Sequence, residues 1–204
     1  MWNWFQKGGM FMWPLLIVAI IGLVFVLERL IVLARAKVNT KKFISRIREA
    51  LKEGGVDKAM EVCINTRGPL AAIFHSGLTR HKHGIQYVEK AIEEAGAIEM
   101  AFLEKGLIWL ATVISLAPMM GFLGTVSGMI NAFDAIAAAG DVEPVIVASG
   151  ISEALITTEA GLIIAIPVQA AYNYFVSTID RLIIDMEESS NALIDALMEM
   201  GISK

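Results

Sequence analysis

The feature that most limits how this chain can fold is a run of 28 residues, 106–133, that contains no charged side chain. As a helix rising 1.5 Å per residue, the run would reach roughly 42 Å, more than the ~30 Å hydrocarbon core of a bilayer. Lys105 and Asp134 end it on either side. A segment of this length and composition predicts a transmembrane helix that tilts or protrudes from the membrane.

Two further apolar segments complete the pattern. Residues 10–28 follow an aromatic N-terminus, 1–9, whose tryptophans favour a membrane interface, and residues 144–179 contain only two charges, Glu153 and Glu159. Hydrophobic residues make up 56% of the chain and charged residues 19%, with a mean hydropathy of +0.62. We therefore expect an all-α integral membrane protein with three transmembrane helices, at 10–28, 106–133 and 144–179.

A cleavable secretory signal is the alternative interpretation of the first apolar segment. Ala34-Arg35-Ala36 imitates a small-residue cleavage site, and Lys7 stands where a signal has its basic end. The apolar run is longer than a usual signal core, and Glu28 and Arg29 separate it from that site. We therefore favour a retained transmembrane helix.

Residues 29–105, between the first and second spans, have the composition of a soluble helical domain. Apolar residues recur there at helical spacing, and Gly54-Gly55 and Arg67-Gly68-Pro69 interrupt the pattern. His81 to Gly84 is typical of a polar loop, and the stretch that follows predicts one long helix rising into the second span. The tail, 180–204, alternates acidic and apolar residues, which predicts an amphipathic helix prolonging the third span.

The distribution of basic residues predicts the orientation in the membrane. Fourteen of the 17 Lys and Arg residues lie in 29–105, whereas the short acidic turn at 134–143 has none. Because basic segments stay in the cytoplasm, we expect the helical domain and the C-terminus there, and the N-terminus and the turn on the far side. A net charge of −4 argues against nucleic acid as a partner.

Polar and small residues interrupt the second and third spans where a simple lipid anchor would carry Leu and Val. Hydroxyls and carboxylates at this depth need protein or water beside them. At 100° per residue, Glu153 and Thr157 share a face, while Thr158 and Glu159 point to other sides. One three-helix subunit cannot cover all these groups, so we expect a homo-oligomer with a wet path between close-packed helices. The candidate path residues are Thr125, Glu153, Thr157, Thr158 and Glu159; the packing glycines are Gly121, Gly124, Gly128 and Gly161; and the candidate helix bends are Pro118 and Pro167.

A purely structural interpretation of the same residues stays open. Threonine hydroxyls can bond to carbonyls of their own helix, and the glycines can simply pack. Elsewhere, Cys63 has no partner at metal-ligand spacing, and no nearby carboxylate or cysteine completes a ligand set with His75, His81 and His83. We therefore expect neither a metal site nor another cofactor.

The sequence resembles the ExbB/TolQ family of proton-channel proteins, which is distantly related to the flagellar stator protein MotA. The resemblance lies in two motifs of the second and third spans, and Glu28-Arg29 at the end of the first span also looks like the family. The matching residues are Ala117-Pro118, Gly121-Phe122-Leu123-Gly124-Thr125-Val126, Gly128-Met129-Ile130 and Ala132-Phe133, then Gly150-Ile151-Ser152-Glu153-Ala154-Leu155, Thr157-Thr158, Gly161-Leu162, Ala165-Ile166-Pro167 and Tyr172-Asn173.

The resemblance implies a homo-pentamer in the bacterial inner membrane, with the far side being the periplasm. The second and third spans would line a pore that encloses helices of an ExbD/TolR-like partner carrying the aspartate that titrates. Thr125 and Thr158 would be the pore-facing hydroxyls, and Glu153 the polar residue near the outer end of the third span. The complex would use the proton motive force to drive a TonB- or TolA-like transducer. Glu159 departs from the pattern, as either a protonated acid at a subunit interface or a second proton-carrying site.

Three functions are weighed against one another. A motor subunit of the ExbB type is the first, with a TolQ-type role in outer-membrane integrity and cell division as its near alternative. A non-conducting scaffold that oligomerises through its glycine faces is the second. A membrane enzyme is the third and least favoured, because no His, Cys or Ser constellation stands at catalytic spacing within the spans.

Overall fold

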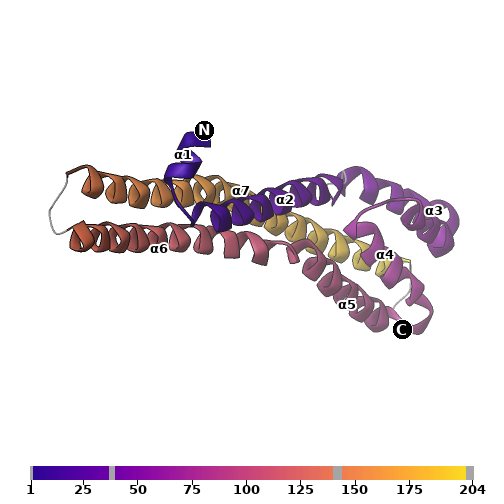
Figure 1. The fold of residues 1–204 in the computed structure, drawn as a ribbon. Helices are drawn as coiled ribbons and strands as arrows, with labels where there is room; N and C mark the ends of the chain where they lie inside the picture. The colour runs from indigo at the N-terminus through magenta and orange to yellow at the C-terminus, as the bar shows by residue number, and fades with distance from the viewer. Residues whose placement is uncertain (1, 37–39, 140–143, 201–204) are drawn as a thin grey trace. The chain divides into compact units, whose positions relative to one another are not determined.

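The computed structural model describes residues 2–36, 40–139 and 144–200, and the regular structure in these ranges is all helical (Figure 1). Among the described residues, three helical stretches are long and apolar enough to cross a membrane, and they cover most of each of the three predicted spans. The elements are α1 (Trp2–Lys7), α2 (Met12–Ala36), α3 (Thr40–Ile64), α4 (Pro69–Thr79), the short 3-10 helix η1 (His81–His83), α5 (Ile85–Glu104), α6 (Leu107–Ala139) and α7 (Pro144–Glu199).

The chain divides into two compact units. The first consists of Met1–Arg29 and Gly106–Tyr174, and so holds α1, most of α2, α6 and the first part of α7. The second consists of Leu30–Lys105 and Phe175–Lys204, and so holds α3, α4, η1, α5 and the rest of α7. Most of the residues in the apolar spans thus belong to one compact unit, and the segment that we expected to be a soluble helical domain belongs to the other.

The first unit is built around a point where α2 meets α6 and α7. A Cβ atom on Gly22 of α2 would lie 3.0 Å from Val113 of α6 and 3.3 Å from Val168 of α7, so the missing side chain lets the three helices approach. Nearby, the rings of Phe25 and Trp109 stack with centroids 5.6 Å apart. Many large apolar side chains of these helices face outward, as a surface that meets lipid or other subunits requires.

The second unit has a core of its own. Phe43 of α3 packs on Phe74 of α4 with ring centroids 5.4 Å apart. Gly55 adopts a φ of +66°, which interrupts α3 at the glycine pair that predicted a break. Pro69 opens α4, as its fixed φ and missing N–H favour at a helix start. Other deeply buried side chains of this unit include Ile47, Ile73, Leu78, Val88, Ile179 and Leu197.

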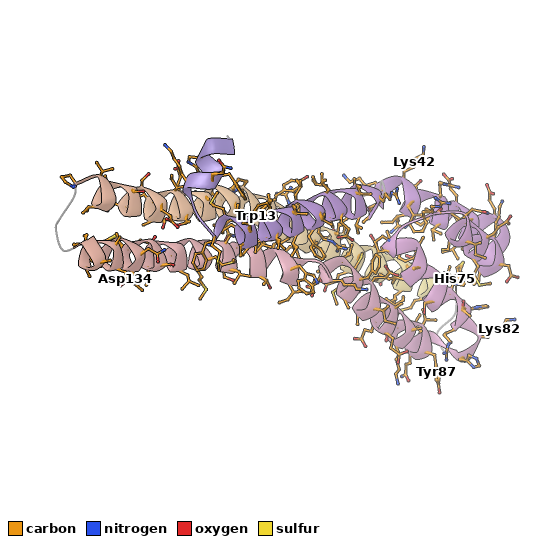
Figure 2. The ribbon with its side chains drawn as sticks, viewed as in Figure 1. Trp13, Lys42, His75, Lys82, Tyr87 and Asp134 are labelled. Carbon is orange, nitrogen blue, oxygen red and sulfur yellow. The ribbon has the colours of Figure 1, made fainter. Side chains whose placement is uncertain are left out.

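Two helix boundaries in the second span differ from our expectation. The helix expected to run unbroken from residue 85 ends at Glu104, and α6 begins only at Leu107. At its other end α6 continues to Ala139, so residues 134–139, expected in the turn, are helical. Asp134, labelled in Figure 2, ends the apolar run without ending the helix, because the alanines that follow are strong helix formers. Residues 140–143 of the expected turn lie outside the described residues.

The polar segment after α4 also differs from expectation. His81 to His83 form a 3-10 helix instead of a loop, and Nδ1 of His81 donates to the carbonyl oxygen of Leu78 at 2.7 Å. The ring of His83 lies 5.8 Å from that of Tyr87. Each of these two histidines thus has a contact within its own short stretch of chain. Within the described ranges, no group of three His, Cys, Asp or Glu side chains is placed to hold a metal ion.

The third span and the tail form a single helix. α7 continues without interruption past residue 180 to Glu199, as a helical prolongation of the span requires, and residues 201–204 of the tail lie outside the described residues. Pro167 lies inside α7 and Pro118 lies inside α6. Both helices continue beyond their prolines, each of which removes one backbone N–H donor.

Candidate functional site

The site lies in a close contact between α6 and α7, within the first unit. Glycines on both helices create this contact. A Cβ on Gly161 would lie 2.5 Å from the carbonyl oxygen of Ala117, and one on Gly121 would lie 3.0 Å from the carbonyl oxygen of Thr157. A Cβ on Gly128 would lie 3.1 Å from the backbone nitrogen of Ala154. Backbone therefore packs on backbone along this contact, as small residues permit in membrane helices.

Thr157 lies inside this contact. Its side chain is 1% exposed, and its hydroxyl donates to the Ala154 carbonyl oxygen at 2.8 Å. A Cβ on Gly124 would lie 2.5 Å from the Thr157 hydroxyl oxygen, so the Thr157 side chain occupies the space that a side chain at residue 124 would need. Sequence periodicity included Thr157 among the path residues, whereas its place in the structure suits helix packing.

Thr125 and Thr158 bring a pair of hydroxyls together across the same contact. The two hydroxyl groups hydrogen-bond to each other, and both side chains are half-buried. The Thr125 oxygen also lies 3.2 Å from the Ala154 carbonyl oxygen and 3.3 Å from that of Gly121. The Thr158 oxygen lies 3.3 Å from the same Gly121 carbonyl oxygen.

This network has more acceptors than hydrogens. Each threonine hydroxyl carries one hydrogen but can accept as well as donate. If Thr125 donates to Thr158, then Thr158 can donate to Gly121; in the reverse order, Thr125 donates to Ala154 or Gly121. The pair can therefore hold its hydrogens in two directions, which is the property a proton relay needs.

The two carboxylates of α7 occupy different environments. Glu153 is half-buried, and its carboxylate lies against Gly9 in the turn that joins α1 to α2. Glu159 is exposed, on a helix surface that also presents Leu155 and Leu162 to the outside. The structure thus joins Thr125 to Thr158 directly but does not bring Glu159 to that pair.

A buried arginine stands at the other end of this unit. Arg29 is 3% exposed, and its Nε donates to Oε2 of Glu28 at 2.6 Å. A Cβ on Gly106 would lie 2.5 Å from that same Nε, so the guanidinium packs on the backbone where the second span begins. The sequence showed the charged pair Glu28-Arg29 at the end of an apolar run, but it did not show that the Arg29 guanidinium packs on Gly106.

The family follows from the sequence match. The model of the MotA/TolQ/ExbB proton channel family matches residues 65–188, which include α6, the hydroxyl pair and most of α7. The chain belongs to this family. With three helical stretches suited to cross a bilayer, it is a membrane protein, and the predicted family resemblance is confirmed.

Individual relatives agree with this assignment. The chain is 32% identical over 177 residues to a protein of Methanothermobacter thermautotrophicus named as a biopolymer transport ExbB homolog, covering 86% of this chain and 63% of that protein. It is 33% identical over 177 residues to an ExbB-like protein of Synechocystis, covering 85% and 69%. A Tol-Pal system protein TolQ of Pseudomonas aeruginosa is 43% identical over 96 residues, covering 47% and 42%. The chain thus spans about two thirds of the first two relatives.

Proposed function

We propose that this chain is the channel subunit of an inner-membrane complex that couples proton flow to mechanical work on a TonB-like transducer for outer-membrane transport. The observation that carries the proposal is the hydroxyl pair of Thr125 and Thr158, held between α6 and α7 with two possible hydrogen directions. Family membership and the ExbB names of the relatives support it.

The proposed mechanism needs a partner that ionises. A threonine hydroxyl can relay or orient a proton but does not ionise near neutral pH, so Thr125 and Thr158 conduct only beside a group that does. That group is the membrane aspartate of an ExbD/TolR-like single-span protein enclosed by the channel subunits. One charge moving through 100 mV releases about 2.3 kcal/mol, a modest stroke that a rotating or rocking inner helix can collect from successive subunits.

A homo-pentamer surrounding the partner completes the proposal. Glu153, Thr158 and Glu159 face different sides of α7, and Glu159 lies exposed on the single subunit. A carboxylate at the centre of a bilayer costs roughly 2.5 to 3.5 kcal/mol on insertion scales, so Glu159 needs a neighbouring subunit or pore water beside it. We assign it to the proton path as a secondary group.

The second candidate function is the TolQ-type role, in which the same channel drives a TolA-like protein. The match to TolQ of Pseudomonas aeruginosa favours it, since that identity is higher although over a shorter stretch. A non-conducting scaffold is the third candidate, which the close-packed glycines alone would satisfy. The identity of the co-purifying transducer separates the first two, and proton flux separates both from the third.

The test is proton flux into liposomes, followed with a trapped pH-sensitive dye. Liposomes would contain this protein alone, the complex with its single-span partner, or the complex in which the partner aspartate is changed to Asn. We expect flux from the intact complex only. Flux from this protein alone at the rate of the complex would overturn the partner-dependent mechanism. Native mass spectrometry of the same samples would give the subunit ratio, for which we expect five copies of this chain.

A further inference from the structure

The N-terminal turn makes a contact with α7 that the proposed mechanism does not use. This turn, residues 8–11, joins α1 to α2 in the first unit, and Figure 1 shows α1 beside α7. A Cβ on Gly8 would lie 2.9 Å from Cγ2 of Ile156. On Gly9 it would overlap the Glu153 carboxylate, with Oε1 as its nearest atom. The carboxylate therefore rests directly on the backbone of Gly9.

The turn has a defined shape. Gly9 adopts a φ of +67°, a conformation that L side chains rarely take. The N–H of Gly8 donates to the Trp4 carbonyl oxygen at 3.2 Å, and the N–H of Gly9 donates to that of Gln6 at 3.3 Å. The rings of Phe5 and Trp13 meet edge to face with centroids 5.2 Å apart, which ties α1 to the start of α2. Gly9 is thus presented to α7 by a hydrogen-bonded turn.

We infer that Gly9 is a positioning residue for Glu153: the turn forms a seat that the carboxylate occupies only because residue 9 has no side chain. This inference rests on the proposed function and on the sequence-based prediction that Glu153 is one of its proton-path residues. A glutamate side chain has three rotatable bonds, and the seat restricts where its carboxylate can lie at the outer end of α7. The N-terminal segment thereby acts on the path from outside the α6 and α7 pair.

The chain supplies two matched controls for Gly9. Gly55 has nearly the same φ, +66°, but a Cβ there would meet nothing within 4 Å. Gly55→Ala therefore imposes the backbone strain without the clash. Gly8→Ala disturbs the same turn, yet its Cβ meets Met12 and Ile156 and not the carboxylate. An effect of Gly9→Ala beyond both controls belongs to the contact with Glu153.

The first measurement is proton flux in the complex, at equal amounts of assembled protein. We expect Gly9→Ala to lower flux about tenfold, and Gly55→Ala and Gly8→Ala to change it less than about twofold. In a Glu153→Asp background the shorter side chain leaves room for the new Cβ, so Gly9→Ala should lower flux less than about threefold further, as coupled neighbours do. Equal losses in both backgrounds would show that Gly9 does not act through the carboxylate and would overturn the inference.

The second measurement does not depend on conduction. In membranes that contain this protein without its partner, a carbodiimide modifies accessible protonated carboxyl groups, and mass spectrometry gives the rate at Glu153. We expect Gly9→Ala to raise this rate at least about threefold by displacing the carboxylate from its seat, with Gly55→Ala unchanged. An unchanged rate in Gly9→Ala refutes the positioning role. A raised rate together with a non-conducting wild-type complex supports the seat and refutes the proposed function.

Discussion

At the scale of single residues, two adjacent threonines of α7, Thr157 and Thr158, make different contacts. Thr157 is enclosed by Gly124 and bonds to its own helix, whereas Thr158, one position later, reaches across to Thr125. Successive helix residues differ by 100° in direction, so the Thr157 hydroxyl lies inside the contact between α6 and α7 while the Thr158 hydroxyl lies at the edge of that contact. Two adjacent residues of the same type therefore have different consequences when they are changed.

Replacing Thr158 by Val is expected to abolish proton flux while leaving assembly intact. Valine has nearly the shape of threonine but neither donates nor accepts, so the relay to Thr125 is lost and the packing is kept. We expect at least about a hundredfold loss, in line with the usual contribution of a positioned proton-transfer group. Thr125→Val should behave in the same way. Flux in liposomes and size-exclusion chromatography of the complex measure the two properties.

Thr158→Ser is the matched control, because it keeps the hydroxyl and removes only a methyl group. Its flux should stay within about tenfold of the wild type. Glu159→Gln should give a partial loss, smaller than that of Thr158→Val, since Glu159 lies apart from the hydroxyl pair. Wild-type flux in Thr158→Val would mean that the hydroxyl pair is structural.

At the scale of the helices, the contact between α6 and α7 depends on the absence of side chains. Gly161→Ala would place a Cβ 2.5 Å from the Ala117 carbonyl oxygen, and backbone cannot move aside as the end of a flexible side chain can. We expect a loss of about 1–3 kcal/mol of stability, as for other overpacked sites. Gly124→Leu and Gly128→Leu, which add more atoms, should break assembly before they affect membrane insertion.

Gly96→Ala on α5 is the control for these helix substitutions. A Cβ at residue 96 would meet nothing within 4 Å, so the change should stabilise the helix by up to about 1 kcal/mol through its better helix propensity. Thermal unfolding in detergent would compare the two alanine variants, which should shift the midpoint in opposite directions. A Gly161→Ala protein as stable as the wild type would contradict the close-packing argument.

Sequence patterns located the spans but not their contacts. The charge-free run marked the second span, and the glycine pair marked the break in α3, because these effects depend on local composition. The break at Lys105 and Gly106 was missed, since no proline or glycine pair announces it and Gly106 instead accommodates Arg29. Periodicity separated Thr157 from Thr158 but could not say which one is enclosed by Gly124 and which one pairs with Thr125. The Gly9 contact with Glu153 joins distant parts of the chain and left no periodic signal.

At the scale of the whole molecule, the orientation in the membrane can be tested with a single background thiol. Cys63 is 3% exposed, and burial raises its pKa to about 12. Because the reactive form is the thiolate, Cys63 should react slowly with maleimides in the folded protein from pH 7 to 9 and quickly after denaturation. Cys63 of the wild-type chain should therefore contribute little labelling beside an introduced cysteine, and rapid labelling of Cys63 would indicate that the protein has unfolded.

Lys82→Cys and Asp134→Cys would then report the two sides of the membrane. Both native side chains are exposed and are labelled in Figure 2, the first in η1 and the second near the end of α6. If the basic segment is cytoplasmic, a membrane-impermeant maleimide applied from the periplasmic side should label Asp134→Cys in intact spheroplasts and Lys82→Cys only after lysis. Labelling of Lys82→Cys in intact spheroplasts, with Asp134→Cys protected, would reverse the topology. It would then place the Gly9 seat and Glu153 on the cytoplasmic side, opposite to the side that the basic residues predict.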